Sequence, residues 1–287
     1  MLDLKEASIE IREIINNRQK ELKLTFEEET HTYTMVDTNN LVKNDWPSVS
    51  KIMKYFYTEF DTEGISYKKA KGDLVIQKKL LEEWKSAGDY STNMGSRTHF
   101  ILEKKSLEMF DIKKEIRQPI FDCDFTQILK SDSMVSAGIN FLELMKERGA
   151  MLLDTEIILG DNKLGYTGAP DKVWLINNKE KTEICLLITD YKTNKPKNFE
   201  SNIFTKKMKK PFENLEDTAL GHYTTQLPFY GKLILEMLKG SKYENIKLIG
   251  CIIVLLKETG EFEEFRINKN IINTILEMDM GKYILKK

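Results

Sequence analysis

The chain contains 287 residues, of which 41% are hydrophobic, so it can build a sizeable core in one large domain or two small ones. Its 44 lysines and arginines nearly balance its 45 aspartates and glutamates, which excludes a uniformly basic nucleic-acid binder but leaves open a local basic patch. The three cysteines lack CxxC spacing, which argues against a disulfide framework, a zinc site and an iron–sulfur cluster and favours a reducing, cytoplasmic location.

The N-terminal part of the chain, residues 1–148, is mainly helical in pattern. Residues 4–22 place apolar side chains three to four positions apart, which predicts an amphipathic helix. The same segment mixes acids and bases and has no apolar stretch, so we expect neither a signal peptide nor a membrane span. Alternation around Tyr33 and a turn pattern at residues 37–40 predict a short hairpin near residues 24–45.

More helices are expected up to the middle of the chain. Ser48 is suited to cap a helix that begins VSKIMKYF. Residues 62–148 are rich in Lys, Glu, Leu and Ala, which predicts helices interrupted near Asp89 to Asn93 and near residues 122–124. We therefore expect the main sheet to come from the second half of the chain.

The pattern changes to strands after Gly149. Three β-rich runs, MLLDTEIILG, APDKVWLIN and TEICLLITDYKT, are separated by turn signals. A helix then begins near Thr218, and residues 246–256 form a long apolar run suited to a buried strand. These runs predict an α/β or α+β fold with a central mixed sheet flanked by helices. The sequence contains no internal repeat and no linker, so we expect a single domain over residues 1–287, with its sheet in residues 149–287.

Candidate catalytic side chains come at the ends of two of these strands. Asp171 stands at the head of one strand, and Asp190 and Lys192 stand at the end of the next. Two neighbouring strands can bring those ends together. Because side chains alternate along a strand, Asp190 and Lys192 point to one face while Tyr191 points away. Two carboxylates and an ammonium group are therefore expected to share one site.

This set of groups fits a magnesium centre. Mg²⁺ usually takes one or two carboxylates together with water and substrate phosphate, and Asp171 and Asp190 are suited to supply them. The main-chain carbonyl of Tyr191 is a further candidate ligand. Lys192 would position or help to deprotonate the attacking water and offset the charge that builds on a scissile phosphate. The alternative is a pair of ordinary turn acids with a solvated lysine, because a bare D…DxK pattern often arises by chance.

The segment GSRTHFILE adds a second group of candidates. Gly95, His99 and Glu103 recur every four residues, so His99 and Glu103 lie on one face of a helix. An imidazole and a carboxylate there are suited to complete or tune a metal centre. Arg97 is a candidate for a phosphate contact. The plainer interpretations are a surface histidine and an arginine held in a salt bridge.

The segment HYTTQLPFYGKLILEML carries a third group. Gln226 and Tyr230 are four residues apart and Tyr223 precedes the glutamine by three, so all three are candidates for contact with a nucleic-acid backbone or base. The alternative is an amphipathic helix whose aromatic residues belong to the core. Pro228 favours the start of a helix or a kink between Gln226 and Tyr230.

A basic loop lies between these motifs. Four lysines flank Met208, namely Lys206, Lys207, Lys209 and Lys210. Beside a phosphodiester site such a loop steers a nucleic-acid strand, with a salt-dependent contribution to binding. The alternative is a solvated loop without a ligand.

Four short motifs therefore occur in a fixed order, in helix, strand, strand and helix contexts. They are Gly95-x3-His99-x3-Glu103, Gly168-x2-Asp171, Asp190-Tyr191-Lys192 and Gln226-x3-Tyr230. This series resembles that of the RecB-type nucleases of the PD-(D/E)xK superfamily, over about residues 47–235. The segments WPSVSKIMKYF, LLEEWKSAGDYSTNMGSRTH and DYKTNKPKNF are similar to the branch that includes the mitochondrial genome maintenance exonuclease and its phage-borne relatives.

The resemblance implies a PD-(D/E)xK core and a Mg²⁺- or Mn²⁺-dependent deoxyribonuclease that binds one or two ions. By this resemblance His99, Asp171 and Asp190 hold the metal. Lys192 assists the attacking water, and the glutamine–tyrosine pair supports the site or the substrate.

The resemblance also implies exonuclease action on DNA ends, with single strands and 5′ ends favoured, in replication, recombination or repair. The chain lacks the four-cysteine cluster of some RecB-type relatives, a targeting peptide and a helicase motif. We therefore expect a stand-alone viral or bacterial enzyme of the cytoplasm, with DNA as its substrate, replication or recombination proteins as partners and no membrane.

Three alternatives stay open. The first keeps the fold but makes the protein a structure-selective endonuclease that cuts flaps or junctions. The second is a non-catalytic nucleic-acid binder, which is disfavoured because both aspartate positions and the lysine position hold competent side chains. The third is a helical scaffold in which the DxK pattern is a coincidence.

Overall fold

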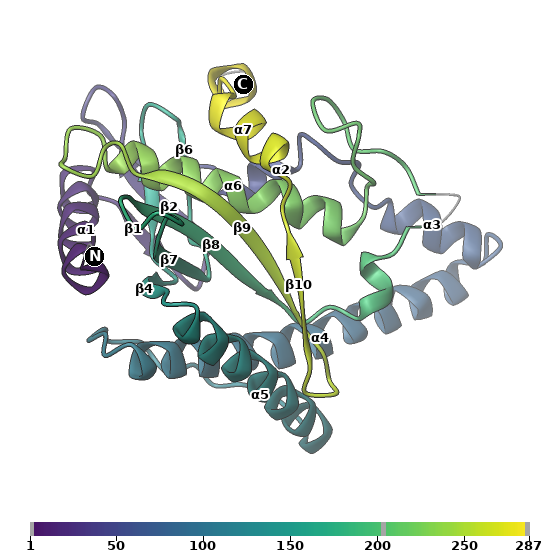
Figure 1. Cartoon of the computed structure of the whole chain (residues 1–287). Coiled ribbons are helices and arrows are strands. Elements are labelled where there is room, and N and C mark those ends of the chain that lie inside the picture. The colour runs from purple at the N-terminus through teal and green to yellow at the C-terminus, as the bar shows by residue number, and fades with distance from the viewer. Residues whose placement is uncertain (1–2, 202–204, 285–287) are drawn as a thin grey trace.

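A five-stranded mixed sheet forms the centre of the molecule and carries helices on both faces (Figure 1). The computed structural model describes residues 3–201 and 205–284. The strand order is β10-β9-β8-β7-β4, in which β8 and β9 are parallel and the other pairs are antiparallel. The strands are β4 (Met151–Thr155), β7 (Lys172–Asn177), β8 (Ile184–Lys192), β9 (Lys247–Leu256) and β10 (Phe262–Arg266). This confirms the expected mixed sheet flanked by helices.

Two helical layers cover the sheet because its central strand is apolar on both faces. In β8, Leu186 and Ile188 belong to one core cluster, whereas Leu187 and Tyr191 belong to the other. The first layer contains α1 (Leu4–Glu21), α2 (Val49–Met53), α6 (Ala219–Met237) and α7 (Lys269–Glu277). The second contains α4 (Leu74–Met109) and α5 (Phe125–Glu147). None of the helices in the described ranges has both the length and the apolar composition needed to cross a membrane.

Smaller elements surround this core. The expected N-terminal hairpin forms a three-stranded sheet in the order β1-β2-β3, and β5 pairs with β6. These strands are β1 (Thr25–Glu27), β2 (Thr32–Val36), β3 (Val42–Lys43), β5 (Leu159–Asp161) and β6 (Tyr166–Gly168). The remaining short helices are α3 (Thr62–Lys69), the 3₁₀ helix η1 (Pro196–Phe199) and α8 (Gly281–Ile284).

Polar caps fix the starts of the helices. The Ser48 side chain accepts a hydrogen bond from the Lys51 amide, as expected from the sequence. Thr218 caps α6 in the same way. At the start of α5, Asp124 and Gln127 exchange side-chain and main-chain hydrogen bonds in a capping box.

Two expectations about helix breaks were wrong. The 36-residue helix α4 runs unbroken through Asp89 to Asn93. Side chains that often favour turns bond elsewhere here, since Ser91 Oγ donates to the Ala87 carbonyl and Asn93 Nδ2 donates to the Asp122 carbonyl. Pro228 lies inside α6, so the helix start expected there as one alternative was wrong.

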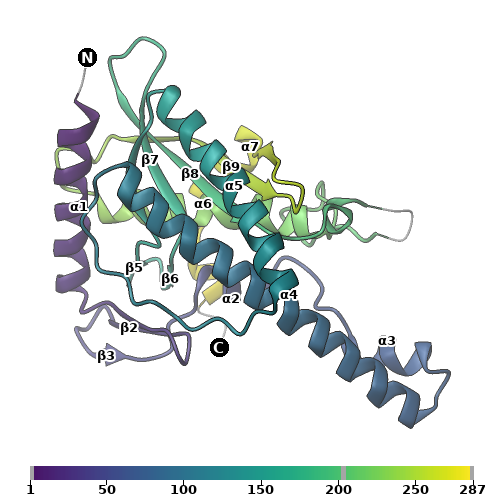
Figure 2. The same cartoon turned by 90° about the horizontal axis from the view of Figure 1, so that it is seen from below.

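The chain does leave the helical pattern between α4 and α5. Residues 110–124, which we call the strap, contain no helix or strand and include the expected break at residues 122–124. Figure 2 shows the strap returning from the end of α4 past β5 and α2 to the start of α5. It is fastened at Lys114, which bonds Asp154, and at Phe121, whose ring lies 5.7 Å from that of Phe100.

Candidate active site

The two predicted aspartates lie side by side at one end of the sheet. Because β7 and β8 are antiparallel with Lys172 opposite Thr189, the residue before β7 faces the end of β8. The Tyr191 main-chain N–H donates to Asp171 Oδ2 over 2.7 Å, which ties the two strand ends together. Asp171 is 9% exposed and Asp190 is 4% exposed. Strand pairing thus produces a buried pair of carboxylates, as the sequence predicts.

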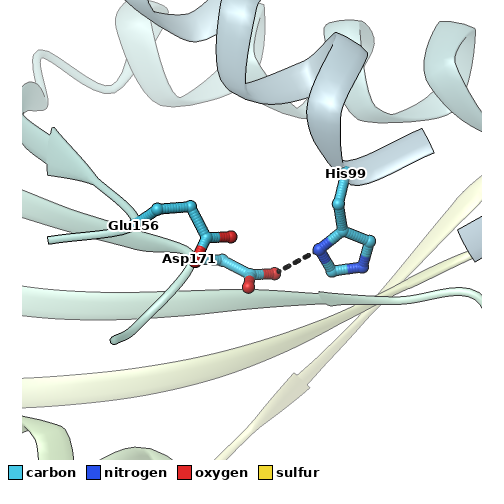
Figure 3. Close-up of side chains that lie close together, drawn as sticks. All are labelled: His99, Glu156 and Asp171. Carbon is cyan, nitrogen blue, oxygen red and sulfur yellow. Dashed lines mark ion pairs between the residues drawn. The ribbon is translucent and has the colours of Figure 1, made fainter. Parts of the chain in front are cut away.

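His99 approaches this pair from helix α4. Its Nδ1 lies 3.2 Å from Asp171 Oδ2, and the ring is half-buried between the helix and the sheet (Figure 3). The His99 ring also meets the edge of the Tyr191 ring, with centroids 6.4 Å apart. The structure therefore brings together the histidine and the aspartates that the sequence singled out.

A third acidic group, Glu156, joins the site and was missed by sequence reasoning. It follows β4 directly, has a positive φ of 45°, and donates its main-chain N–H to the Asp171 carbonyl over 3.1 Å. This turn directs its carboxylate toward Asp171 and His99 (Figure 3). One ligand atom from each of the three residues lies within 4.8 Å of the others. A single acid inside the apolar run TEIILG was the available signal.

Burial and mutual repulsion shift the pKa values of these acids. Burial and the Asp171 charge raise the pKa of Glu156 to about 8. Burial and the same charge raise the pKa of Asp190 to about 6, although Lys192 opposes this shift. Burial favours a protonated Asp171 as well, but His99 and the nearby lysines hold its pKa below the usual range. At neutral pH the cluster therefore retains a proton on Glu156.

The protonation of His99 follows from the same neighbours. Burial disfavours the charged ring, but the charge and hydrogen bond of Asp171 outweigh burial and raise the pKa of His99. In the metal-free site, Asp171 thus favours the charged form of His99 beside a protonated Glu156. A divalent cation would replace the Glu156 proton.

Lys192 is held between a carboxylate and an aromatic ring. Its ammonium group forms an ion pair with Asp190 and lies 4.3 Å from the ring centroid of Tyr223. The Tyr223 hydroxyl donates to Asn194 Oδ1 over 3.0 Å. Burial opposes the charged form of Lys192, but Asp190 and Asp171 outweigh burial and raise its pKa. Lys192 is therefore a cation at neutral pH.

A second lysine, Lys172, lies behind the site and was also missed by sequence reasoning. It is 2% exposed, and its ammonium group lies 4.5 Å from the Tyr191 ring centroid. Burial lowers its pKa, while Asp171, Glu156 and other nearby carboxylates oppose that shift. Its sequence context, directly after Asp171 at the head of a strand, gives no local sign of burial. Lys172 therefore lies within electrostatic reach of the carboxylates of the site, beside the Tyr191 ring.

The glycines of the motifs permit close contacts between the motif segments. A Cβ on Gly168 would lie 2.6 Å from the ring of Tyr230, and a Cβ on Gly95 would lie 2.9 Å from Thr193 Oγ1. Gln226 Nε2 donates to the Tyr230 hydroxyl over 2.8 Å, so this pair is internally bonded. The four motifs thus pack against one another around the carboxylates.

Other candidate residues have partners within the protein. Glu103 Oε1 accepts a hydrogen bond from Thr155 Oγ1 over 3.2 Å and lies 3.8 Å from Lys114 Nζ. These contacts of Glu103 support the turn that carries Glu156. Arg97 Nη1 donates to Ser131 and to Asp132, each over 2.8 Å, and so joins α4 to α5. Its predicted phosphate contact would have to compete with these bonds.

A large groove leads to the site. It has a volume of about 1780 Å³ and is lined by the N-terminal hairpin, the middle of α4, the strap and the segment after β8. Of the site residues, His99, Glu156 and Tyr230 line the groove, whereas Asp171, Asp190 and Lys192 lie outside its lining. The strap, which lines the groove, is joined to the hairpin by an exposed ion pair of 3.9 Å between Arg117 and Glu29.

The basic loop lies outside the groove lining. Met208 is buried and anchors the loop, and Lys207 pairs with Glu216 at 2.5 Å. Three further lysines are exposed, namely Lys206, Lys209 and Lys210. Lys195 and Asn198, which precede the basic loop in the chain, do line the groove. Contact between the four predicted lysines and a strand therefore requires the strand to extend beyond the groove.

The donor set fits a divalent cation. It contains one imidazole and three carboxylates, and Asp190 Oδ2 is buried without a hydrogen bond of regular geometry beside its ion-paired lysine. Carboxylate-rich sites of this kind suit Mg²⁺ and Mn²⁺. Among the described residues, one group of three or more such side chains has metal-binding geometry, and it is His99, Glu156 and Asp171. A comparison with models of known protein families finds no match, and neither does a comparison with curated proteins.

Proposed function

We propose that the protein is a metal-dependent deoxyribonuclease with a PD-(D/E)xK core that acts as an exonuclease on DNA ends. One observation carries the proposal: Asp171, Asp190 and Lys192 meet at the ends of neighbouring strands, with His99 and Glu156 beside them. Two strands that present an acid, a second acid and a lysine at one end of a mixed sheet support this core. The order of the four motifs supports the RecB-type branch.

Four side chains would hold the cation, namely His99, Glu156, Asp171 and Asp190. When bound, the cation supplies Lewis-acid polarisation of the phosphate and a more acidic water. The protein supplies a fixed position for the substrate phosphate between the carboxylates and Lys192. It also excludes bulk water, because both aspartates are buried.

Lys192 acts as a cation in this proposal, because its raised pKa keeps it protonated. Its ammonium group donates to the phosphate or the attacking water and offsets the negative charge of the transition state. Tyr223 and Asp190 orient it from two sides. Lys192 is disfavoured as the base that deprotonates the attacking water, because a protonated amine cannot accept a proton.

The strap favours an exonuclease over a flap or junction endonuclease. Because the strap lines the groove, is fastened at both ends and is joined to the hairpin by Arg117, we infer that a strand reaches the site by passing beneath it. A free end can be threaded under a bridge, whereas a closed circle cannot. A single strand, which is narrower than a duplex, suits such a passage.

The wider biological role follows the resemblance alone. Action in replication, recombination or repair, a cytoplasmic site of action and a 5′ preference belong to the proposal. The basic loop with its four lysines and the Arg97 side chain are its candidate contacts to the DNA backbone.

The test is digestion of linear and covalently closed circular single-stranded DNA of equal length by the purified protein. With Mg²⁺ or Mn²⁺ we expect rapid loss of the linear strand, stable circles and no reaction in EDTA. Blocking each end in turn reports the polarity. Equal cleavage of circles would replace the exonuclease by an endonuclease, and binding without cleavage in Mn²⁺ would refute the nuclease.

A further inference from the structure

Helix α3 and the first part of α4 form an arm that projects from the body of the molecule (Figures 1 and 2). The arm covers residues 60–90, and its two helices pack against each other. Thirteen large hydrophobic side chains are exposed in the described part of the chain, and five of them lie on this arm. These are Phe60, Tyr67, Leu74, Val75 and Ile76. The arm thus presents apolar surface that the protein itself leaves uncovered.

An aromatic and cationic cluster joins the two helices of the arm. The Phe60 ring meets the Trp84 ring at 6.1 Å and 60°, and Lys69 Nζ lies 5.3 Å from the Trp84 ring centroid. Phe60 is 65% exposed, so much of its ring is open to a ligand. Aromatic rings beside a lysine are the groups that hold unpaired bases and the adjacent phosphates.

The same face of α4 leads from this cluster to the catalytic groove. Trp84, Gly88, Ser91, Gly95 and His99 follow one another at steps of three or four residues, so they share one side of the helix. The last four of these residues line the groove. A Cβ on Gly88 would meet no atom within 4 Å, so this part of the floor is open. At a rise of 1.5 Å per residue, Trp84 lies about 22 Å from His99 along the helix.

We propose that Phe60, Trp84 and Lys69 form a stacking site for an unpaired base of the DNA strand whose end lies in the groove. The inference rests on the proposed function, since it takes the groove as the path of a single strand. At about 3.4 Å per stacked nucleotide, 22 Å corresponds to roughly six nucleotides between the site and the scissile bond. Strands shorter than this cannot reach the cluster.

The charges near the cluster favour a nucleic acid over a protein partner. Lys69 lies over the Trp84 ring, and its chain neighbour Lys68 and the Trp84 neighbour Lys85 are also exposed. Two of the acids on the arm, Asp61 and Asp73, cap helix N-termini and bond main-chain amides there. Lys69 therefore provides a cation directly beside the open rings, although Glu82 and Glu83 precede Trp84 on the same helix.

Binding of short and long strands tests the inference. We would measure the dissociation constants of fluorescein-labelled oligo-dT of 4 and 12 nucleotides by anisotropy, in EDTA so that no cleavage occurs. The wild type should bind the 12-mer more tightly than the 4-mer. The difference in affinity should exceed the electrostatic contribution of the additional phosphates. In Phe60→Ala and Trp84→Leu this advantage should fall about tenfold, because stacking on an aromatic ring is the lost contribution.

Tyr67→Ala is the matched control, because Tyr67 is exposed on the same arm but lies outside the cluster. It should keep the wild-type advantage of the 12-mer, and circular dichroism should show folded protein in all variants. An unchanged 12-mer advantage in Phe60→Ala overturns the stacking site. The stacking site is also overturned if the wild type forms a concentration-dependent dimer, Phe60→Ala is monomeric, and both bind DNA equally.

The two proposals fail separately. If the protein binds the 12-mer through Phe60 but cleaves nothing in Mg²⁺ or Mn²⁺, the nuclease fails and the stacking site stands. If linear DNA is digested in Mg²⁺ but the variants bind both oligonucleotides as the wild type does, the stacking site fails and the nuclease stands.

Discussion

The ion pair of Asp190 with Lys192 determines whether the lysine takes part in the chemistry as a charged ammonium group or as a neutral amine. Two carboxylates near the ammonium group outweigh the effect of burial, so the lysine remains charged. The Tyr223 ring on the other side stabilises the same charged form. Tyr223 is therefore a positioning residue for Lys192, in addition to its predicted contact with DNA.

Two substitutions of Tyr223 separate these roles. Tyr223→Phe keeps the ring beneath Lys192 and loses only the hydrogen bond to Asn194, so we expect kcat within about twofold of the wild type. Tyr223→Leu removes a cation–π contact of about 1 kcal/mol, so kcat should fall roughly fivefold with KM unchanged. Single-turnover cleavage in Mg²⁺ measures both values. A rise in KM in place of a fall in kcat would assign Tyr223 to the substrate.

Glu156 links the stability of the metal-free protein to pH. Its pKa rises from 4.5 to about 8 on folding, so the folded state binds this proton more tightly than the unfolded state. The resulting stabilisation is complete below pH 4.5 and is lost as the pH rises through 8. In EDTA the melting temperature of the wild type should therefore fall across this window.

Glu156→Gln is the test of that dependence, because glutamine does not titrate. Asp190 also has a raised pKa, of about 6, so the variant should keep part of the slope and lose the remainder. Thermal melts of both proteins in EDTA at closely spaced pH values give the difference. Parallel curves for the two proteins would show that Glu156 is ionised in the folded state.

The crossing of α4 and α5 sets the position of the helix that carries His99. A Cβ on Gly138 of α5 would lie 2.4 Å from Leu102 Cδ1 of α4, three residues beyond His99. Nearby, Thr98 and Ser131 share a buried hydrogen bond of 2.8 Å. The crossing therefore needs a residue without a side chain on α5 to bring the imidazole to Asp171.

Substitution of Gly138 should consequently destabilise the protein. We expect Gly138→Ala to lower the free energy of unfolding by about 1 to 3 kcal/mol through overpacking against Leu102. Gly88→Ala is the matched control, because its Cβ meets open space and alanine is the better helix former, so it should be stabilising by roughly 0.5 to 1 kcal/mol. Guanidinium unfolding measures both. Equal effects of the two substitutions would contradict this description of the crossing.

The elements show where sequence reasoning succeeds and where it stops. Strand alternation predicted that Asp190 and Lys192 share a face, and the turn signals predicted that Asp171 stands at the head of the preceding strand. Both depend on local geometry alone. Glu156 depends on a turn that returns the chain from β4 toward β7, which no local pattern reports. The unbroken α4 depends on a partner for Asn93 that lies 29 residues further on.

At the scale of the whole molecule, the candidate metal centre joins separate parts of the fold. His99 belongs to α4 on one face of the sheet, whereas the three acids belong to β4, β7 and β8 or to the turns beside them. Without a cation, this junction contains a proton on Glu156 and a 3.2 Å contact between His99 Nδ1 and Asp171 Oδ2. A bound cation would connect helix and sheet directly.

Metal binding should therefore stabilise the fold. At a concentration 100 times the dissociation constant, Mn²⁺ or Mg²⁺ should add about 2.7 kcal/mol to the free energy of unfolding and raise the melting temperature. Asp171→Asn should remove this increase, because it removes a central ligand. Differential scanning calorimetry with and without the metal measures the effect. The same increase in wild type and variant would place the ion elsewhere.

The most direct test of the proposed nuclease is the rate of Mg²⁺-dependent release of nucleotides from a labelled linear single strand. The wild type and the surface control Lys239→Met should react alike, because Lys239 pairs only with Glu236 at the exposed end of α6 among the described ion pairs. Asp190→Asn and Lys192→Met should each be slower by about 10² to 10³ or more. Unchanged rates in both active-site variants would contradict the assignment of the reaction to this site.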